Sequence, residues 1–192
     1  IMELVDAIKG RRSIRKYTSE PVAREVIEEI LEEAVWAPSG QNLQPWYFLA
    51  LTQKEELHEL FDILGTSAFS HRKKLEKRFA NNPEVVEETM EFSREMGGAP
   101  CIILAFLLKP TYSDDDLPSC IESVAAAMQD ICLLAYDKGL GTCWIEEVVR
   151  EREKIEARFA PDKGRLLGAV ILGHPAQESH PIKRKPGRYD IR

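Results

Sequence analysis

Residues 118–138 carry apolar side chains over more of a helical surface than a single stripe would need. These side chains recur at helical spacing and include Ile121, Val124, Ala125, Met128, Ile131, Cys132, Leu134 and Ala135. A helix of this kind has to be buried on more than one side. In a chain of 192 residues the cover comes either from a second subunit or from a central position in a monomer. The sequence alone leaves both arrangements open.

Three further apolar segments predict strands. Residues 100–108 are continuously apolar, which is typical of a strand buried on both faces. Residues 46–51 and 166–172 are shorter runs of aromatic and aliphatic side chains. Helices are predicted over residues 2–9, 22–37, 54–64 and 148–159. The charged region 67–96 is expected to form two helices, broken at Asn81-Asn82-Pro83 and packed loosely on the body.

Positive charge is concentrated near the start of a chain that is acidic overall. The chain has 26 Lys and Arg against 32 Asp and Glu, a formal net charge of −6, which argues against the broad positive field of a nucleic-acid binder. Residues 9–16 nevertheless read KGRRSIRK, without one acidic residue. Because arginine presents a planar fork of donors that suits phosphate, this segment is a candidate phosphate clamp. A solvated basic face or a nucleic-acid contact is the alternative interpretation.

Other features bear on compartment and metal binding. The longest apolar run is about half the length of a membrane-spanning helix, and the first residues do not have the pattern of a signal peptide. We therefore expect a cytoplasmic protein without a membrane partner. The four cysteines form no C-x-x-C pair and no zinc pattern, so they are interpreted as buried thiols, and no metal site is expected.

Two loops carry further candidate ligand contacts. Residues 37–46 read APSGQNLQPW, so several amide and hydroxyl groups lie on a loop that prolines hold at both ends. Residues 139–147 read GLGTCWIEE, where glycines allow a flat ligand to approach the backbone closely. The alternatives are an ordinary helix-to-strand connection for the first loop, and a helix cap followed by a strand for the second.

Taken in order, RRSIRKY, APSGQNLQPW, GLGTCWI and RKP resemble the signature of the FMN-dependent nitroreductase family, over nearly the whole chain. The resemblance implies an α+β fold with a mostly antiparallel central sheet flanked by helices. It also implies an intertwined homodimer with two FMN sites at the subunit interface. Residues 1–192 would form a single FMN-binding domain, with residues 174–192 as a tail that reaches the partner subunit.

The resemblance assigns cofactor-binding residues by position. The first segment supplies the phosphate and pyrimidine contacts through Arg11, Arg12, Ser13 and Arg15. The loop contributed by the other subunit supplies Pro38, Ser39 and Asn42. The segment that passes the isoalloxazine ring contains Thr142, Cys143, Trp144 and Ile145. Near the C-terminus, Arg184 and Lys185 match the last phosphate contact, and no residue is assigned as a catalytic acid or base.

The implied activity is hydride transfer from NADH or NADPH through flavin N5 to an electrophilic small-molecule acceptor, a nitroaromatic or a quinone, in a ping-pong cycle. Two alternatives are a specialised flavin enzyme of the same fold, acting in dehalogenation, flavin fragmentation or dehydrogenation, and a non-enzymatic anion or nucleic-acid binder. Glu146 and Glu147 depart from the family pattern and are expected to narrow the pocket or repel anionic substrates. The charged segment 69–92 has no motif that assigns it a role.

Overall fold

Four strands form one sheet in the computed structural model, which describes residues 2–108 and 113–192. The strand order is β1-β2-β4-β3, and all three neighbouring pairs are antiparallel. The strands are β1 (Trp46–Leu51), β2 (Cys101–Leu107), β3 (Gly141–Ile145) and β4 (Arg165–Gly173). Every residue of β2 is buried, as predicted for a strand covered on both faces. The strand β3 is formed by residues of the GLGTCWI motif. The alternative interpretation of this motif, a helix cap followed by a strand, therefore describes its local structure.

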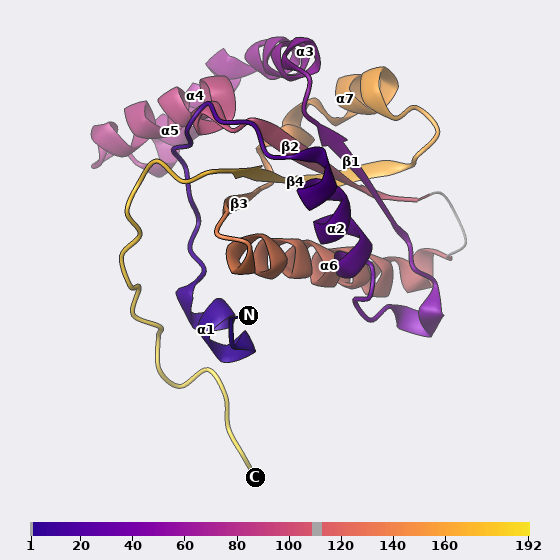
Figure 1. Cartoon of the computed structure of the whole chain (residues 1–192). Coiled ribbons are helices and arrows are strands. Elements are labelled where there is room, and N and C mark those ends of the chain that lie inside the picture. The colour runs from indigo at the N-terminus through magenta and orange to yellow at the C-terminus, as the bar shows by residue number, and fades with distance from the viewer. Residues whose placement is uncertain (1, 109–112) are drawn as a thin grey trace.

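Helices cover both faces of this sheet (Figure 1). The helices are α1 (Leu4–Gly10), α2 (Arg24–Ala34), α3 (Lys54–Gly65), α4 (Ala68–Arg78), α5 (Pro83–Glu95), α6 (Leu117–Asp137) and α7 (Arg152–Phe159). Short 3₁₀ turns lie at η1 (Gly40–Asn42), η2 (Met96–Gly98), η3 (Asp114–Asp116) and η4 (Glu147–Glu151). The helices α2 and α6 lie on one side of the sheet, and α3 and α7 lie on the other (Figure 1). The predicted α+β fold is confirmed.

The alternation of side chains along the strands creates the two cores. On β2, Ile103 and Ala105 pack into the cluster with α2 and α6, whereas Ile102 and Leu104 pack into the cluster with α3 and α7. The break between α4 and α5 falls where it was predicted, because α5 begins at Pro83, a residue suited to the first helical turn. No residue of α4 is buried, which agrees with loose packing of that helix, whereas α5 buries Val86 and Ser93 and is packed more closely than predicted.

Two predicted helices have different ends. The helix predicted over 22–37 ends at Ala34, because the chain tightens into turns in which Trp36 N and Ala37 N bond to carbonyls three residues back, ahead of Pro38. Trp36 is 88% exposed as a result. The segment predicted as a helix over 148–159 is divided between the 3₁₀ turn η4 and the α-helix α7.

Helix α6 has 21 residues and is therefore about 30 Å long. One side packs on the sheet and α2, while Ile121 on another side is exposed. Residues 114–137 are long and apolar enough to cross a membrane by length and composition alone, a property that the core helix of a soluble protein shares. Only 39% of the most apolar part of this helix is buried. One chain therefore does not give α6 the all-round cover of a central helix in a monomer.

The chain after β4 forms no helix or strand and is largely exposed. Its first residues run beside the N-terminal segment, since Thr18 N donates to His174 O (3.0 Å) and Ala176 N donates to Lys16 O (2.9 Å). Gln177 Oε1 accepts a bond from Arg15 N at 2.8 Å. Beyond this contact, the yellow end of the chain in Figure 1 extends away from the body.

Gly97 fixes the N-terminal segment against η2, and we predict that Gly97→Ala destabilises the fold strongly. Its φ is +68°, and a Cβ there would collide with the carbonyl group of Arg15. The expected loss is about 2–3 kcal/mol in the free energy of unfolding, measured by urea denaturation. Gly65→Ala is the control, because a Cβ at Gly65 meets nothing within 4 Å. Equal urea midpoints for the two variants would contradict this account.

Candidate functional site

The RRSIRKY segment lies along the outer edge of β3. Ser13 forms a parallel bridge with Thr142, and Ile14 N donates to Thr142 O at 2.8 Å. This close approach requires glycine at position 141, since a Cβ there would lie 2.9–3.0 Å from the Ile14 side chain. The structure thus brings together two motifs that are about 130 residues apart in sequence.

A cavity of about 270 Å³ opens beside this contact, and its lining includes Arg11, Arg12 and Thr142. Arg12 Nη1 donates to the carbonyls of Lys9 (2.7 Å) and Arg11 (2.6 Å), and Arg12 Nε donates to His180 O (3.2 Å). Arg11 Nε is buried and has no hydrogen-bond partner among the described residues. A buried cationic donor without a partner is costly, so this position suits an anionic ligand.

A larger cavity of about 850 Å³ has Arg15 in its lining. Its walls come from three parts of the chain, and Gln177 borders both this cavity and the smaller one. The lining consists of Arg15, Lys16, Tyr17, Glu88, Glu91, Phe92, Arg94, Glu95, Gly97, Gly98, Ala176 and Gln177. The residues contributed by α5 were not predicted. Their signal in the sequence was the spacing of Glu88, Glu91 and Glu95, which places three acids on one helical face.

The strand β3 presents only part of the predicted ring-contact segment. Thr142, Cys143 and Ile145 are buried, and Cys143 and Ile145 pack in the core on the α3 side, so their backbones rather than their side chains can face a ligand. Burial raises the pKa of the Cys143 thiol, which keeps it protonated. Trp144 is 38% exposed. Past Thr142, no strand within residues 2–108 and 113–192 pairs with this edge of β3.

The predicted loop residues Pro38, Ser39 and Asn42 lie at the other end of α6 (Figure 1). Gly40 N donates to Ser123 Oγ at 3.2 Å near the start of α6, whereas Tyr136 near its end borders the Arg11 cavity. Thirteen residues of helix separate these two positions by about 20 Å. The structure therefore does not bring this loop to the other predicted site residues within one chain.

The same loop has a strained backbone. Gln41, Asn42 and Gln44 all have positive φ, at 53°, 56° and 47°. Ser39 Oγ accepts a bond from Gln44 N (3.1 Å), and Asn42 Oδ1 accepts one from Gln44 Nε2 (3.0 Å), so the loop is held by its own polar groups. Such strain clusters at ligand-binding positions.

Arg184 and Lys185 lie in the exposed tail, and neither lines the two cavities beside the RRSIRKY segment. The structure therefore does not bring these two predicted phosphate contacts to Arg11 and Arg12 of the same chain. The part of the tail that does approach the site is residues 174–180, through Gln177 and the carbonyl of His180.

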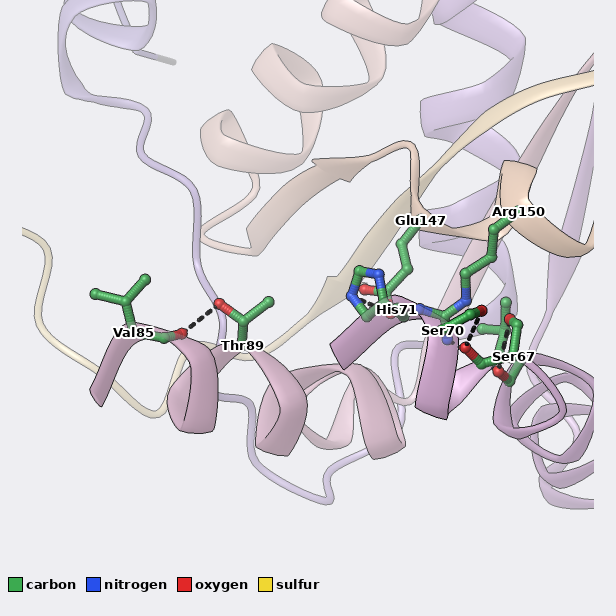
Figure 2. Close-up of polar contacts among 8 residues, drawn as sticks. Ser67, Ser70, His71, Val85, Thr89, Glu147 and Arg150 are labelled. Atoms are coloured by element: carbon green, nitrogen blue, oxygen red, sulfur yellow. Dashed lines mark hydrogen bonds and ion pairs between the residues drawn. The ribbon is translucent and has the colours of Figure 1, made fainter. Parts of the chain in front are cut away.

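Glu147 lies in an ion pair and lines neither cavity beside the RRSIRKY segment, so its carboxylate is not free to repel anions there. Its carboxylate is 11% exposed and accepts a bond from Arg150 Nη1 at 2.6 Å (Figure 2). Arg150 Nη2 donates to Leu64 O at 3.0 Å. His71 Nε2 from α4 lies 3.6 Å from the same carboxylate (Figure 2). This buried cluster ties α3 and α4 to the turn that follows β3. Glu146 is exposed, and its effect stays a prediction.

A model of the nitroreductase family matches residues 8–174. The chain belongs to the nitroreductase family. Two Bacillus subtilis (strain 168) proteins provisionally named NAD(P)H nitroreductases, YfhC and YdgI, are similar to it at 29% and 36% identity. Each alignment covers 96% of this chain, with 91% of YfhC and 94% of YdgI.

Solved structures of nitroreductase-like proteins share the fold. A BluB-like flavoprotein from Clostridium difficile 630 aligns with a TM-score of 0.78 at 24% identity, over 97% of this chain and 96% of that one. A provisionally named nitroreductase in complex with FMN from Desulfovibrio desulfuricans aligns with a TM-score of 0.73 at 28% identity, over 97% and 94% of the two chains. The predicted family and its fold are therefore confirmed.

Acid is predicted to weaken the contact between α4 and η4 through His71. Burial lowers the pKa of His71 below its ordinary value, with Arg150 and Lys74 acting in the same direction and Glu147 opposing them. As the pH falls, His71 is protonated at a higher pH in the unfolded chain than in the folded protein. The folded protein therefore loses stability as the pH falls below about 6.5. His71→Gln should lose less unfolding free energy than the wild type between about pH 7.5 and 5.5. His58→Gln, on the exposed side of α3, is the control, and an equal or greater loss in His71→Gln would refute the assignment.

Arg150→Met should destabilise the fold by about 3 kcal/mol, because it leaves the buried Glu147 carboxylate without its cation. Arg24→Met is the matched control, since the Arg24–Glu28 pair is 84% and 51% exposed and should contribute less than about 0.5 kcal/mol. Urea denaturation measures both. The double change Glu147→Gln with Arg150→Met should recover part of the loss, and no difference between Arg150→Met and Arg24→Met would show that the cluster is not structural.

Proposed function

We propose that this member of the nitroreductase family is an FMN-dependent oxidoreductase that uses NADH or NADPH to reduce an electrophilic small molecule, a nitroaromatic or a quinone. The observation that carries the proposal is the buried, unpartnered Nε of Arg11 beside the edge of β3. The names of YfhC and YdgI and the FMN complex from Desulfovibrio desulfuricans support the choice of donor and cofactor.

The residues beside β3 fit FMN. Arg11 and Arg12 would hold the phosphate, because a guanidinium forms charge-assisted bonds to phosphate oxygens. Ser13 lies next to them on the bridge to Thr142, and the backbone of β3 from Thr142 to Ile145 would lie along the ring. Arg15 borders the larger cavity, with its backbone held by Gln177, and its charge would face the pyrimidine edge.

When bound, FMN supplies the redox chemistry, accepting a hydride from NAD(P)H and reducing the acceptor in a second half-reaction, which gives a ping-pong cycle. The protein's own contribution is position and charge. A cation such as Arg15 at the pyrimidine edge stabilises negative charge that develops there. The assignment needs no acid or base from the chain, and we name none.

A homodimer would complete the site. We propose that Pro38, Ser39 and Asn42 of one subunit, together with Arg184 and Lys185 of its tail, reach the Arg11 cavity of the partner. Three observations support this: the uncovered side of α6, the strained loop, and a basic tail that extends from the body. Each chain would then form a single domain over residues 1–192, with residues 174–192 crossing to the partner.

We also propose that the protein is cytoplasmic. All four cysteines are free and buried, as predicted, and free thiols are typical of a reducing compartment.

The absorbance spectrum of the purified protein, incubated with FMN and then desalted, tests the function directly. We expect bound flavin, and we expect its visible absorbance to bleach when NADH or NADPH is added without oxygen. A protein that retains no flavin, or whose bound flavin neither nicotinamide reduces, would refute the proposal.

Arg11→Ala combined with Arg12→Ala should weaken FMN binding at least about tenfold, because two charge-assisted phosphate contacts are lost. FMN retention is measured by fluorescence titration. Glu146→Ala is one control, and Arg24→Ala with Lys54→Ala is a second that removes two exposed cations on α2 and α3. Removal of Glu147 is a poorer comparison, since that carboxylate belongs to the buried cluster. Equal FMN affinity across these variants would contradict the phosphate assignment.

A further inference from the structure

We propose that Gln177 is a positioning residue for the flavin, because its side-chain carbonyl fixes the backbone from which Arg15 reaches the cofactor. This inference rests on the proposed function, since it concerns the positive charge that Arg15 would place at the pyrimidine edge. Among residues 175–192, Gln177 alone is half-buried, whereas the others are exposed. Of the residues that the structure describes, it is also the only one that lines both cavities beside the RRSIRKY segment.

The tail contacts the N-terminal segment through the main chain before Gln177 is reached. Two main-chain bonds, 3.0 and 2.9 Å long, join residues 16 and 18 to residues 174 and 176. The next bond involves a side chain, since Arg15 N donates to Gln177 Oε1 at 2.8 Å. A substitution at position 177 therefore removes this bond and leaves the main-chain bonds in place, so the contribution of Gln177 can be measured separately.

The backbone of Arg15 is held from two sides. After Arg15, Tyr17 N donates to Gly97 O at 3.0 Å, and the Arg15 carbonyl lies so close to Gly97 that a Cβ there would collide with it. The amide group of Arg15 is held by Gln177. Loss of the Gln177 bond thus releases the segment at the residue whose charge the proposed site uses.

The backbone matters here because the Arg15 side chain is exposed, so packing does not fix its guanidinium. Electrostatic stabilisation is strongest when the charged group is in place before the opposite charge develops. At an effective dielectric constant of about 20, a unit charge moved from about 4 to about 5 Å from its partner loses about fourfold in the equilibrium that it favours. A small shift of Arg15 should therefore change the preference of the site for reduced over oxidised FMN.

The first test examines the bond itself in the FMN-loaded protein. Gln177→Met keeps the length of the side chain and removes the acceptor, so hydrogen exchange of the Arg15 amide, measured by NMR, should become about tenfold faster. Gln177→Glu keeps an acceptor oxygen and should retain the protection. The amide of Tyr17, which bonds to Gly97, is the internal reference and should not change. Equal exchange of the Arg15 amide in the wild type and in Gln177→Met would overturn the inference.

The second test measures the two-electron reduction potential of bound FMN by equilibration with a reference dye. Gln177→Met should lower the potential, because a displaced Arg15 stabilises the reduced cofactor less. A fourfold loss of preference corresponds to a fall of about 18 mV. Gln53→Met is the matched control, since it makes the same change at an exposed position whose side chain does not cap α3, and it should leave the potential unchanged. Equal potentials in Gln177→Met and Gln53→Met would overturn the inference.

A double-variant cycle separates positioning from a general loosening of the tail. In an Arg15→Met background, Gln177→Met should cause no further fall in the potential, because the residue that it positions is gone. An equal fall in both backgrounds would show that Gln177 does not act through Arg15, and would overturn the inference. A protein that retains no flavin, or whose flavin neither nicotinamide reduces, would instead refute the proposed function, so the two failures are distinguishable.

Discussion

The length of α6 is the constraint on which the rest of the site depends. A rigid helix of about 30 Å keeps the loop around Gly40 at its start and the Arg11 cavity at its end. No rotation of side chains can close that distance within one chain. A site that needs both ends must take one of them from another subunit, and the side of α6 that one chain leaves uncovered gives such a subunit a surface to pack on.

Local concentrations of charge differ in whether the protein itself neutralises them. Arg11 lies beside β3 with its buried Nε unpartnered, and a phosphate there would satisfy it. Glu147 is neutralised inside the protein, and this fixes α4 against the turn after β3. The larger cavity is lined by three acids of α5 and by three cations, Arg15, Lys16 and Arg94. The net charge of −6 is therefore compatible with an anionic cofactor, because the positive charge is local.

Much of the fold followed from local sequence pattern, because the buried strand β2 and the proline that begins α5 leave strong signals. The pairing of RRSIRKY with β3 did not, since it depends on a contact between distant segments. Arg150 follows Glu147 at the local i,i+3 spacing, but His71 and Leu64, which complete the same cluster, are far away in sequence and no local pattern connects them to it. The α5 residues that line the larger cavity depend on how that helix packs on the body, which no local pattern in the sequence gives.

Native mass spectrometry of the protein with FMN measures subunit count and flavin count together. Two chains that each contribute half of every site should give a dimer that carries two FMN molecules, with flavin lost when the subunits separate. A monomer that retains one FMN would contradict the shared site, and so would a dimer that binds no flavin.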